Sequence, residues 1–136
     1  MTMDSFDVKE WINYAQEDYE SAAAMAKAVN NPYSPRQVCY HCQQSAEKIL
    51  KAYTIAKGNT LTKTHDLEVL INECMQYSPD FDNLMDFCEP LTPYASITRY
   101  PPLINVTKQD MIQALEYTGE ILKFTKSKLA EMGFDV

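Results

Sequence analysis

The feature that most constrains the fold is a long helical pattern at residues 35–57. Apolar residues recur there at steps of three and four and so line one side of an α-helix: Val38, Cys42, Ala46, Ile49 and Tyr53. Ser34 can cap its start, Pro35 suits the first turn, and Gln37 completes a capping-box spacing. Gly58 stands where a left-handed cap is expected. We therefore predict one helix with one face in the core.

The same segment carries a second line of side chains that is polar. His41, Gln44, Lys48 and Lys51 also recur at steps of three and four, so they share a face of the helix. A solvated surface is the commoner explanation of such a face. A histidine and a glutamine so close to the apolar side also suit the edge of a binding site, and both interpretations stay open.

The other segments also have helical periodicity, and none alternates with the period of two typical of strands. A helix is predicted from the capping-box pair Asp7 and Glu10 to about residue 29. A third helix is predicted at 65–77, capped by Thr64, and a last one begins after Thr107 and ends at Gly133. The turn at 30–33 is short, so the first two helices should pack antiparallel.

Prolines divide the region between the third and the last helix. Ser78 and Pro79 start a helix in the cap-then-proline manner. Pro90 and Pro93 each remove a backbone donor and crowd the preceding turn. We therefore expect a kink or break between residues 88 and 94, a short helical piece beyond it, and an irregular segment at 98–106.

Length and composition favour a single soluble domain. The chain has 136 residues, which is enough for one core without covalent staples. Its formal charge of −7 argues against extended nucleic-acid binding, which needs a basic surface. No apolar run reaches the roughly 20 residues of a membrane span, and residues 1–9 lack the apolar core of a signal peptide. A cytoplasmic location is expected.

Four cysteines occur, at positions 39, 42, 74 and 88. Cys39 and Cys42 have the C-x-x-C spacing of zinc and redox sites, but they lie inside a predicted helix and no second such pair exists. Free cysteine packs as a small apolar residue. We expect buried structural thiols and no bound metal.

Two further polar residues have alternative interpretations. Asp18 falls on the apolar line of the first helix, between Ala15 and Ala22. It is either a carboxylate at the edge of that line or a partly buried acid that pairs with a polar group of the second helix. His65, in the first turn of the third helix, is either a local capping or packing histidine, which we expect, or a catalytic one.

Several of these residues together resemble the HEPN domain (higher eukaryotes and prokaryotes nucleotide-binding). They are Trp11 and Asp18 in the first helix, the run from Tyr40 to Lys48, the sequence Thr64-His65-Asp66-Leu67, and Tyr94 before Arg99-Tyr100-Pro101. The resemblance spans residues 8–129. It implies an all-α, up-and-down bundle of four main helices with an additional short helix, as one domain over residues 1–136. It also implies a homodimer and a minimal nucleotidyltransferase partner.

Many HEPN relatives are ribonucleases or toxins, with an arginine followed after four to six residues by a histidine. Here Arg99 is present, but Ile104, Asn105 and Val106 occupy the positions of the histidine, and no histidine follows His65. Asparagine cannot exchange a proton near neutral pH. No catalytic residue is therefore assigned. Arginine suits phosphate recognition, although Arg99 could instead pair with Asp18 or Glu47.

The sequence thus predicts a non-catalytic nucleotide-binding module. Its expected ligand site is a groove in which the second helix faces the segment 94–100, formed by His41, Gln44, Lys48, Tyr94, Arg99 and Tyr100. No cofactor beyond a nucleotide ligand is expected. The alternatives are an altered ribonuclease or toxin and a helical dimer that binds only protein.

Overall fold

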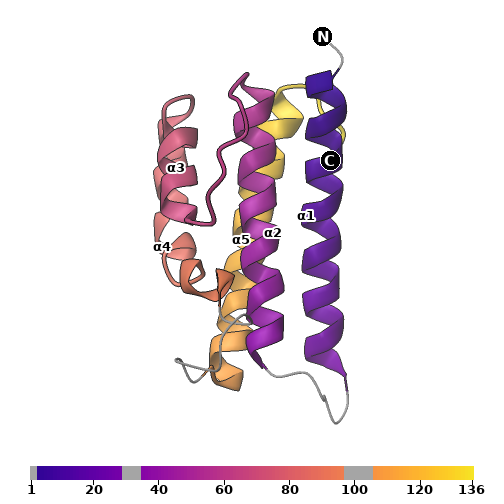
Figure 1. The fold of residues 1–136 in the computed structure, drawn as a ribbon, viewed down its shortest axis with the longest axis vertical. Coiled ribbons are helices and arrows are strands. Elements are labelled where there is room, and N and C mark those ends of the chain that lie inside the picture. Colours follow the sequence, from indigo (N-terminus) through magenta and orange to yellow (C-terminus); the bar gives the residue numbers. More distant parts are fainter. Residues whose placement is uncertain (1–2, 29–34, 97–105) are drawn as a thin grey trace.

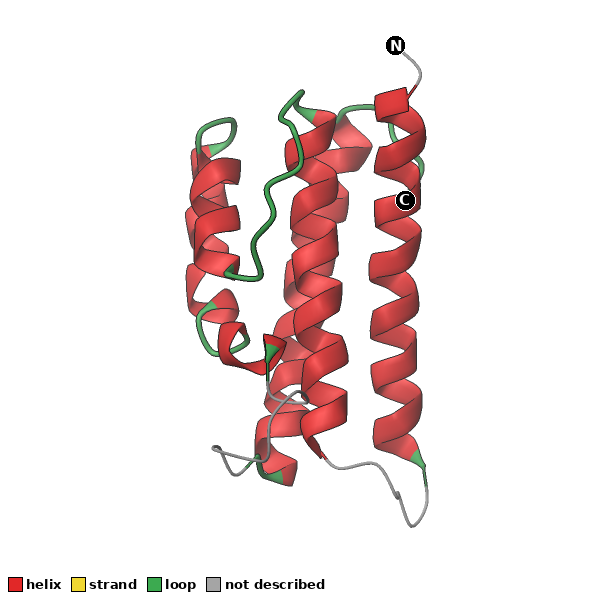
Figure 2. Ribbon diagram, in the orientation of Figure 1, coloured by secondary structure: helices red, strands yellow, loops and turns green. Residues whose placement is uncertain are grey.

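The computed structural model describes residues 3–28, 35–96 and 106–136, and over these ranges its secondary structure is helical without strands (Figure 2). The α-helices are α1 (Met3–Lys27), α2 (Pro35–Ala56), α3 (Leu67–Met75), α4 (Met85–Cys88) and α5 (Lys108–Glu131). Two 3₁₀ helices, η1 (Pro79–Leu84) and η2 (Thr92–Ala95), flank α4. The predicted all-α bundle is confirmed, with α1, α2, α3 and α5 as main helices and α4 as the short one.

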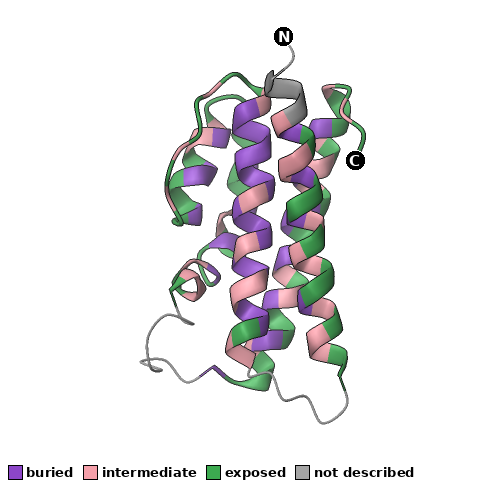
Figure 3. Cartoon of the chain, turned by 45° about the vertical axis from the view of Figure 1, so that its right-hand side comes forward, coloured by how far each residue is buried: buried purple, intermediate pink, exposed green. Residues whose placement is uncertain are grey.

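The bundle is built around α2, which packs against α1, α5 and α3 (Figure 1). Neighbours on several sides bury 14 of its 22 residues. Much of this helix is accordingly purple in Figure 3. The apolar line from Val38 to Tyr53 is buried as predicted. Small residues let α1 approach closely: the Ser45 hydroxyl donates to the carbonyl of Ala15 at 2.7 Å. Burial of this apolar surface is the main source of stability.

The helix ends follow local signals, with two corrections. Asp7 lies inside α1, which begins at Met3, so the predicted cap at Asp7 is wrong. The cap of α3 is Asp66 and not Thr64, because the Asp66 side chain accepts from the Glu68 amide at 2.9 Å. Gly58 has φ +98°, which confirms the left-handed cap after α2. The cap predicted at position 34 lies outside the described residues.

The proline-rich region breaks as predicted. Pro79 starts η1, which passes into the single turn of α4, and η2 follows after the interruption at Pro90. The initial piece is a 3₁₀ helix, and Ser78 makes no side-chain cap. The irregular segment expected at 98–106 lies outside the described residues, apart from its last position.

The last helix has the predicted start. Thr107 and Asp110 form a complete capping box, in which each side chain bonds the other's backbone amide. Gly133, with φ +96°, follows its C-terminal end. None of the described helices combines the length and hydropathy needed to cross a membrane.

Candidate functional site

Five polar side chains of α2 lie on one side of the helix, which we call the α2 polar face: His41, Gln44, Glu47, Lys48 and Lys51. These positions recur at three- and four-residue steps and share a side of the helix. Asp18 of α1 bonds one end of the face. His65 bonds the other end, and it lies in the connector before α3, which consists of residues 57–66. The face is therefore a junction of three chain segments and not a plain solvated surface.

The first cluster joins α1 to α2 through Asp18. Its carboxylate accepts from Lys48 Nζ at 2.6 Å and lies 3.2 Å from His41 Nδ1. The Asp18 side chain is 16% exposed, and those of Lys48 and His41 are 26% and 28% exposed. Of the two interpretations of Asp18, the structure selects the partly buried acid paired with polar groups of the second helix.

The second cluster surrounds Glu47 and lies deeper. Its carboxylate accepts from Lys51 Nζ at 2.8 Å and from Gln43 Nε2 at 3.1 Å, and it lies 2.9 Å from His65 Nδ1. Only 5% of the Glu47 side chain is exposed. Burial tends to raise the pKa of Glu47, but the hydrogen bonds from Lys51, His65 and Gln43 outweigh it and hold this pKa below its ordinary value. Glu47 is therefore an ionised carboxylate in the interior.

Two glutamines extend this network. Gln44 donates to the Gln43 side-chain oxygen at 2.8 Å, and the buried Gln43 donates to the backbone carbonyl of His65 at 2.9 Å. The connector before α3 is thereby held to α2 through both the ring and the carbonyl of His65. Sequence reasoning missed Gln43 and treated Lys51 as part of a surface face. The spacing of four between Gln43, Glu47 and Lys51 was the available signal.

Tyr94 of η2 lies on a different side of α2. Its hydroxyl lies near the thiol of Cys39, and burial raises the pKa of Tyr94. Cys39 and His41 are two positions apart, which is about 200° around a helix. The expectation that His41, Gln44 and Lys48 face Tyr94 is therefore corrected, because Lys48 and His41 turn toward Asp18 of α1.

Arg99 and Tyr100 lie outside the described residues. The two carboxylates considered as partners of Arg99, on Asp18 and Glu47, already have partners among the described residues. Ligand binding by the six predicted site residues stays a prediction.

The cysteines pack as buried thiols. All four are free and buried, and burial raises the pKa of Cys39 and of Cys42 to about 12. Within the described part of the chain, no three histidine, cysteine or acidic side chains come together in a group suited to a metal ion.

Each histidine is held by a carboxylate through Nδ1, His41 by Asp18 and His65 by Glu47. If Nδ1 carries the bonded proton, Nε2 accepts a hydrogen bond when the ring is neutral and donates one when it is charged. Lys48 adds an ammonium beside His41. The Asp18 cluster can thus present donors to an oxyanion.

Comparisons with known proteins agree with this fold. The family model described as "HEPN domain" matches residues 8–129. The solved structure of TT1696 from Thermus thermophilus has a TM-score of 0.74 and 20% identity, covering 89% of this chain and 97% of that one. ST0689, described as an archaeal HEPN homologue, has a TM-score of 0.67 and 21% identity, covering 89% and 96%. A search of curated proteins found no match.

Proposed function

Because the chain belongs to the HEPN domain family, we propose that it is a non-catalytic nucleotide-binding module that acts with a minimal nucleotidyltransferase. The observation that carries the proposal is the Asp18 cluster. There Lys48 and His41 remain about a quarter exposed while the Asp18 carboxylate holds both in place. Charge-assisted hydrogen bonds from such donors suit a phosphate group.

The non-catalytic part of the proposal rests on the histidines. The sequence holds two, His41 and His65, and neither follows Arg99. A ribonuclease of this family would need a proton-transferring group after Arg99, where Asn105 stands. We expect purified protein not to cleave RNA. Metal-independent cleavage that disappears in Arg99→Ala would favour the altered ribonuclease or toxin instead.

The proposed site combines the exposed edge of the α2 polar face with Arg99. Lys48, His41 and Gln44 would donate to phosphate oxygens, and Arg99 would supply a bidentate contact. Tyr100 would stack on a base. Tyr94 contributes indirectly in this scheme, since its packing against the core anchors η2, which ends at Ala95 before Arg99.

The decisive experiment is a calorimetric titration of the protein with ATP, GTP, AMP and inorganic phosphate. We expect binding of at least one nucleotide, weakened about tenfold or more by Lys48→Gln or Arg99→Ala, which corresponds to about 1.4 kcal/mol per tenfold change. Lys63→Gln is the matched control, because it removes the same charge outside the proposed site.

No binding of any nucleotide by the wild type contradicts the proposal and leaves the protein-binding dimer as the better explanation. Equal weakening by Lys48→Gln and Lys63→Gln contradicts the assigned site. If the Arg99→Ala variant melts at a lower temperature than the wild type, and the wild type binds no nucleotide, then Arg99 has a structural role.

A further inference from the structure

A groove runs along α5 on residues that the α2 polar face does not use. It consists of two cavities of about 350 and 590 Å³, which share Phe87 of the η1–α4 segment and Glu120 of α5. We define this α5 groove by Leu84, Phe87, Glu116, Tyr117, Glu120 and Phe124. Because Phe87 and Glu120 line both cavities, the two cavities lie next to each other along α5.

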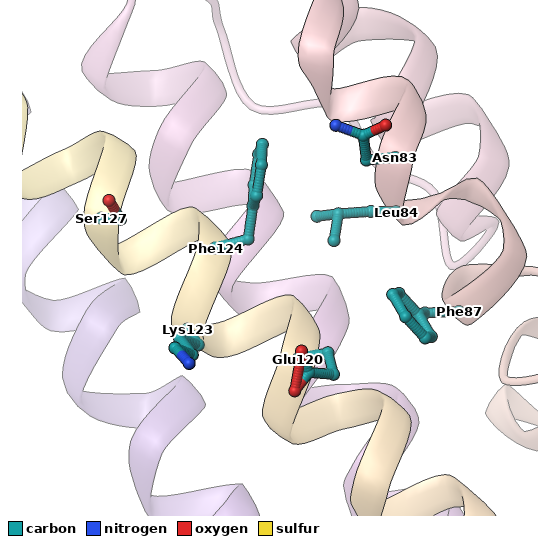
Figure 4. Close-up of a pocket in the computed structure, with 7 residues that line it drawn as sticks. All are labelled: Asn83, Leu84, Phe87, Glu120, Lys123, Phe124 and Ser127. Carbon is teal, nitrogen blue, oxygen red and sulfur yellow. The ribbon is translucent and has the colours of Figure 1, made fainter.

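The floor of the groove is apolar and aromatic. Phe87 and Tyr117 meet edge to face with ring centroids 5.1 Å apart, and Phe124 packs in the same way on the buried Phe81 at 5.1 Å. Figure 4 shows Leu84 and Phe87 on one wall opposite Phe124 on α5. Phe87, Tyr117 and Phe124 are all partly exposed. Supported aromatic rings of this kind are favoured at protein interfaces.

The rim of the groove is acidic. Glu116 and Glu120 line it one turn apart on α5, and both are exposed. Lys123 lines the first cavity and offsets one of these charges. The whole chain has a formal charge of −7, so a second copy would bring more acidic surface to an acidic rim. Charge complementarity therefore favours a basic occupant.

The groove has the length of a short helix. Its α5 lining extends from Leu115 to Ser127, which at about 1.5 Å per residue spans roughly 18 Å, or between three and four turns. An amphipathic helix placed in an apolar groove is a recurring mode of recognition.

We propose that the α5 groove docks an amphipathic helix with a basic edge, supplied by another protein. The apolar face of that helix packs on Phe87, Tyr117 and Phe124, and its lysines or arginines pair with Glu116 and Glu120. The proposal is independent of nucleotide binding.

The test measures fluorescence anisotropy of a labelled synthetic peptide of about 18 residues, long enough to fill the groove, with leucines on one helical face and lysines along its edge. Two matched peptides serve as controls: one has glutamate in place of lysine, and the other has the same composition in scrambled order. We expect the lysine peptide to bind at least tenfold more tightly than either control.

Protein variants locate the contact. Glu120→Lys should weaken binding of the lysine peptide at least fivefold, and Phe87→Ala, with its fold checked by circular dichroism, should do the same. Glu17→Lys is the matched control, because it makes the same charge change at an exposed position of α1, and it should leave binding unchanged. If Phe87→Ala unfolds, Tyr117→Ser takes its place.

Three outcomes overturn the proposal. The first is no binding of the lysine peptide, or equal binding of the scrambled one. The second is equal weakening by Glu17→Lys and Glu120→Lys, which indicates unspecific attraction to an acidic protein. The third is a homodimer that Glu120→Lys or Phe87→Ala dissociates in light scattering, since the occupant is then a second copy.

Discussion

Glu47 is a charged side chain held almost wholly out of water, with 5% of its surface exposed. Glu47→Gln keeps a similar shape but leaves the Lys51 ammonium, which is 7% exposed, without its counter-charge. Removing one partner of a buried ion pair typically costs about 3 kcal/mol or more. We expect such a loss in urea unfolding at neutral pH. Glu17→Gln, at an exposed position, should change stability by less than about 0.5 kcal/mol.

The same pair predicts a pH dependence. The native pKa of Glu47 is held below its ordinary value of 4.5, so its ionised form stabilises the fold at neutral pH, and this contribution is lost as the pH falls through the native pKa. The stability difference between wild type and Glu47→Gln should therefore be largest near neutral pH and shrink as the pH falls below that ordinary value. A difference that grows on acidification would contradict the assignment of Glu47 as an ionised group.

The cysteines give a second prediction for single residues. Burial raises the pKa of Cys39, Cys42 and Cys88 to about 12, and a thiol reacts as its thiolate. A disulfide reagent should modify the four thiols slowly in the native protein and rapidly in concentrated guanidinium.

We also expect no structural metal at Cys39 and Cys42. About one equivalent of zinc per chain, kept through a chelator wash, is the result that speaks against this.

Among the helices, α5 meets the Tyr19 side chain of α1 at a glycine, Gly119. A Cβ at Gly119 would stand 3.2 Å from the hydroxyl of Tyr19, so the missing side chain leaves space for that ring. Alanine is favoured over glycine inside a helix by about 1 kcal/mol. We expect Gly119→Ala to raise stability by less than about 0.5 kcal/mol, because the Tyr19 hydroxyl must shift.

A double-mutant cycle isolates this contact. In a Tyr19→Phe background the hydroxyl is absent, so Gly119→Ala should recover the full gain of about 1 kcal/mol. The free energy of unfolding from urea titrations measures both steps. Equal effects of Gly119→Ala in the two backgrounds would show that the hydroxyl does not limit the packing of α5 on α1.

For the whole molecule we predict a homodimer. The resemblance to HEPN proteins implies it, and the chain carries nine tyrosines, five phenylalanines and a tryptophan, a surplus of the residues enriched at interfaces. Among the described residues, Tyr14 and Tyr77 are 47% and 39% exposed. Light scattering at micromolar concentration should give twice the chain mass of 15.6 kDa. A mass of one chain excludes a stable dimer.

The sequence by itself determined the helices and several of their ends, because these depend on neighbours within one or two turns. The apolar line of α2, the capping box of Thr107 and Asp110, and the left-handed Gly58 were all predictable from local spacing. Periodicity also grouped His41 with Lys48 on one side of α2. The start of α3 was misjudged because Thr64 and Asp66 are both good caps two positions apart.

Only the tertiary structure decided which faces meet. Periodicity assigns a residue to a side of its own helix but does not say which helix covers that side. The bonds of Asp18 to His41 and Lys48 join positions 23 and 30 apart, and the contact of Glu47 with His65 joins positions 18 apart. These partners are set by the crossing of α1 and α2 and by the course of the connector before α3, which depend on how the whole core packs.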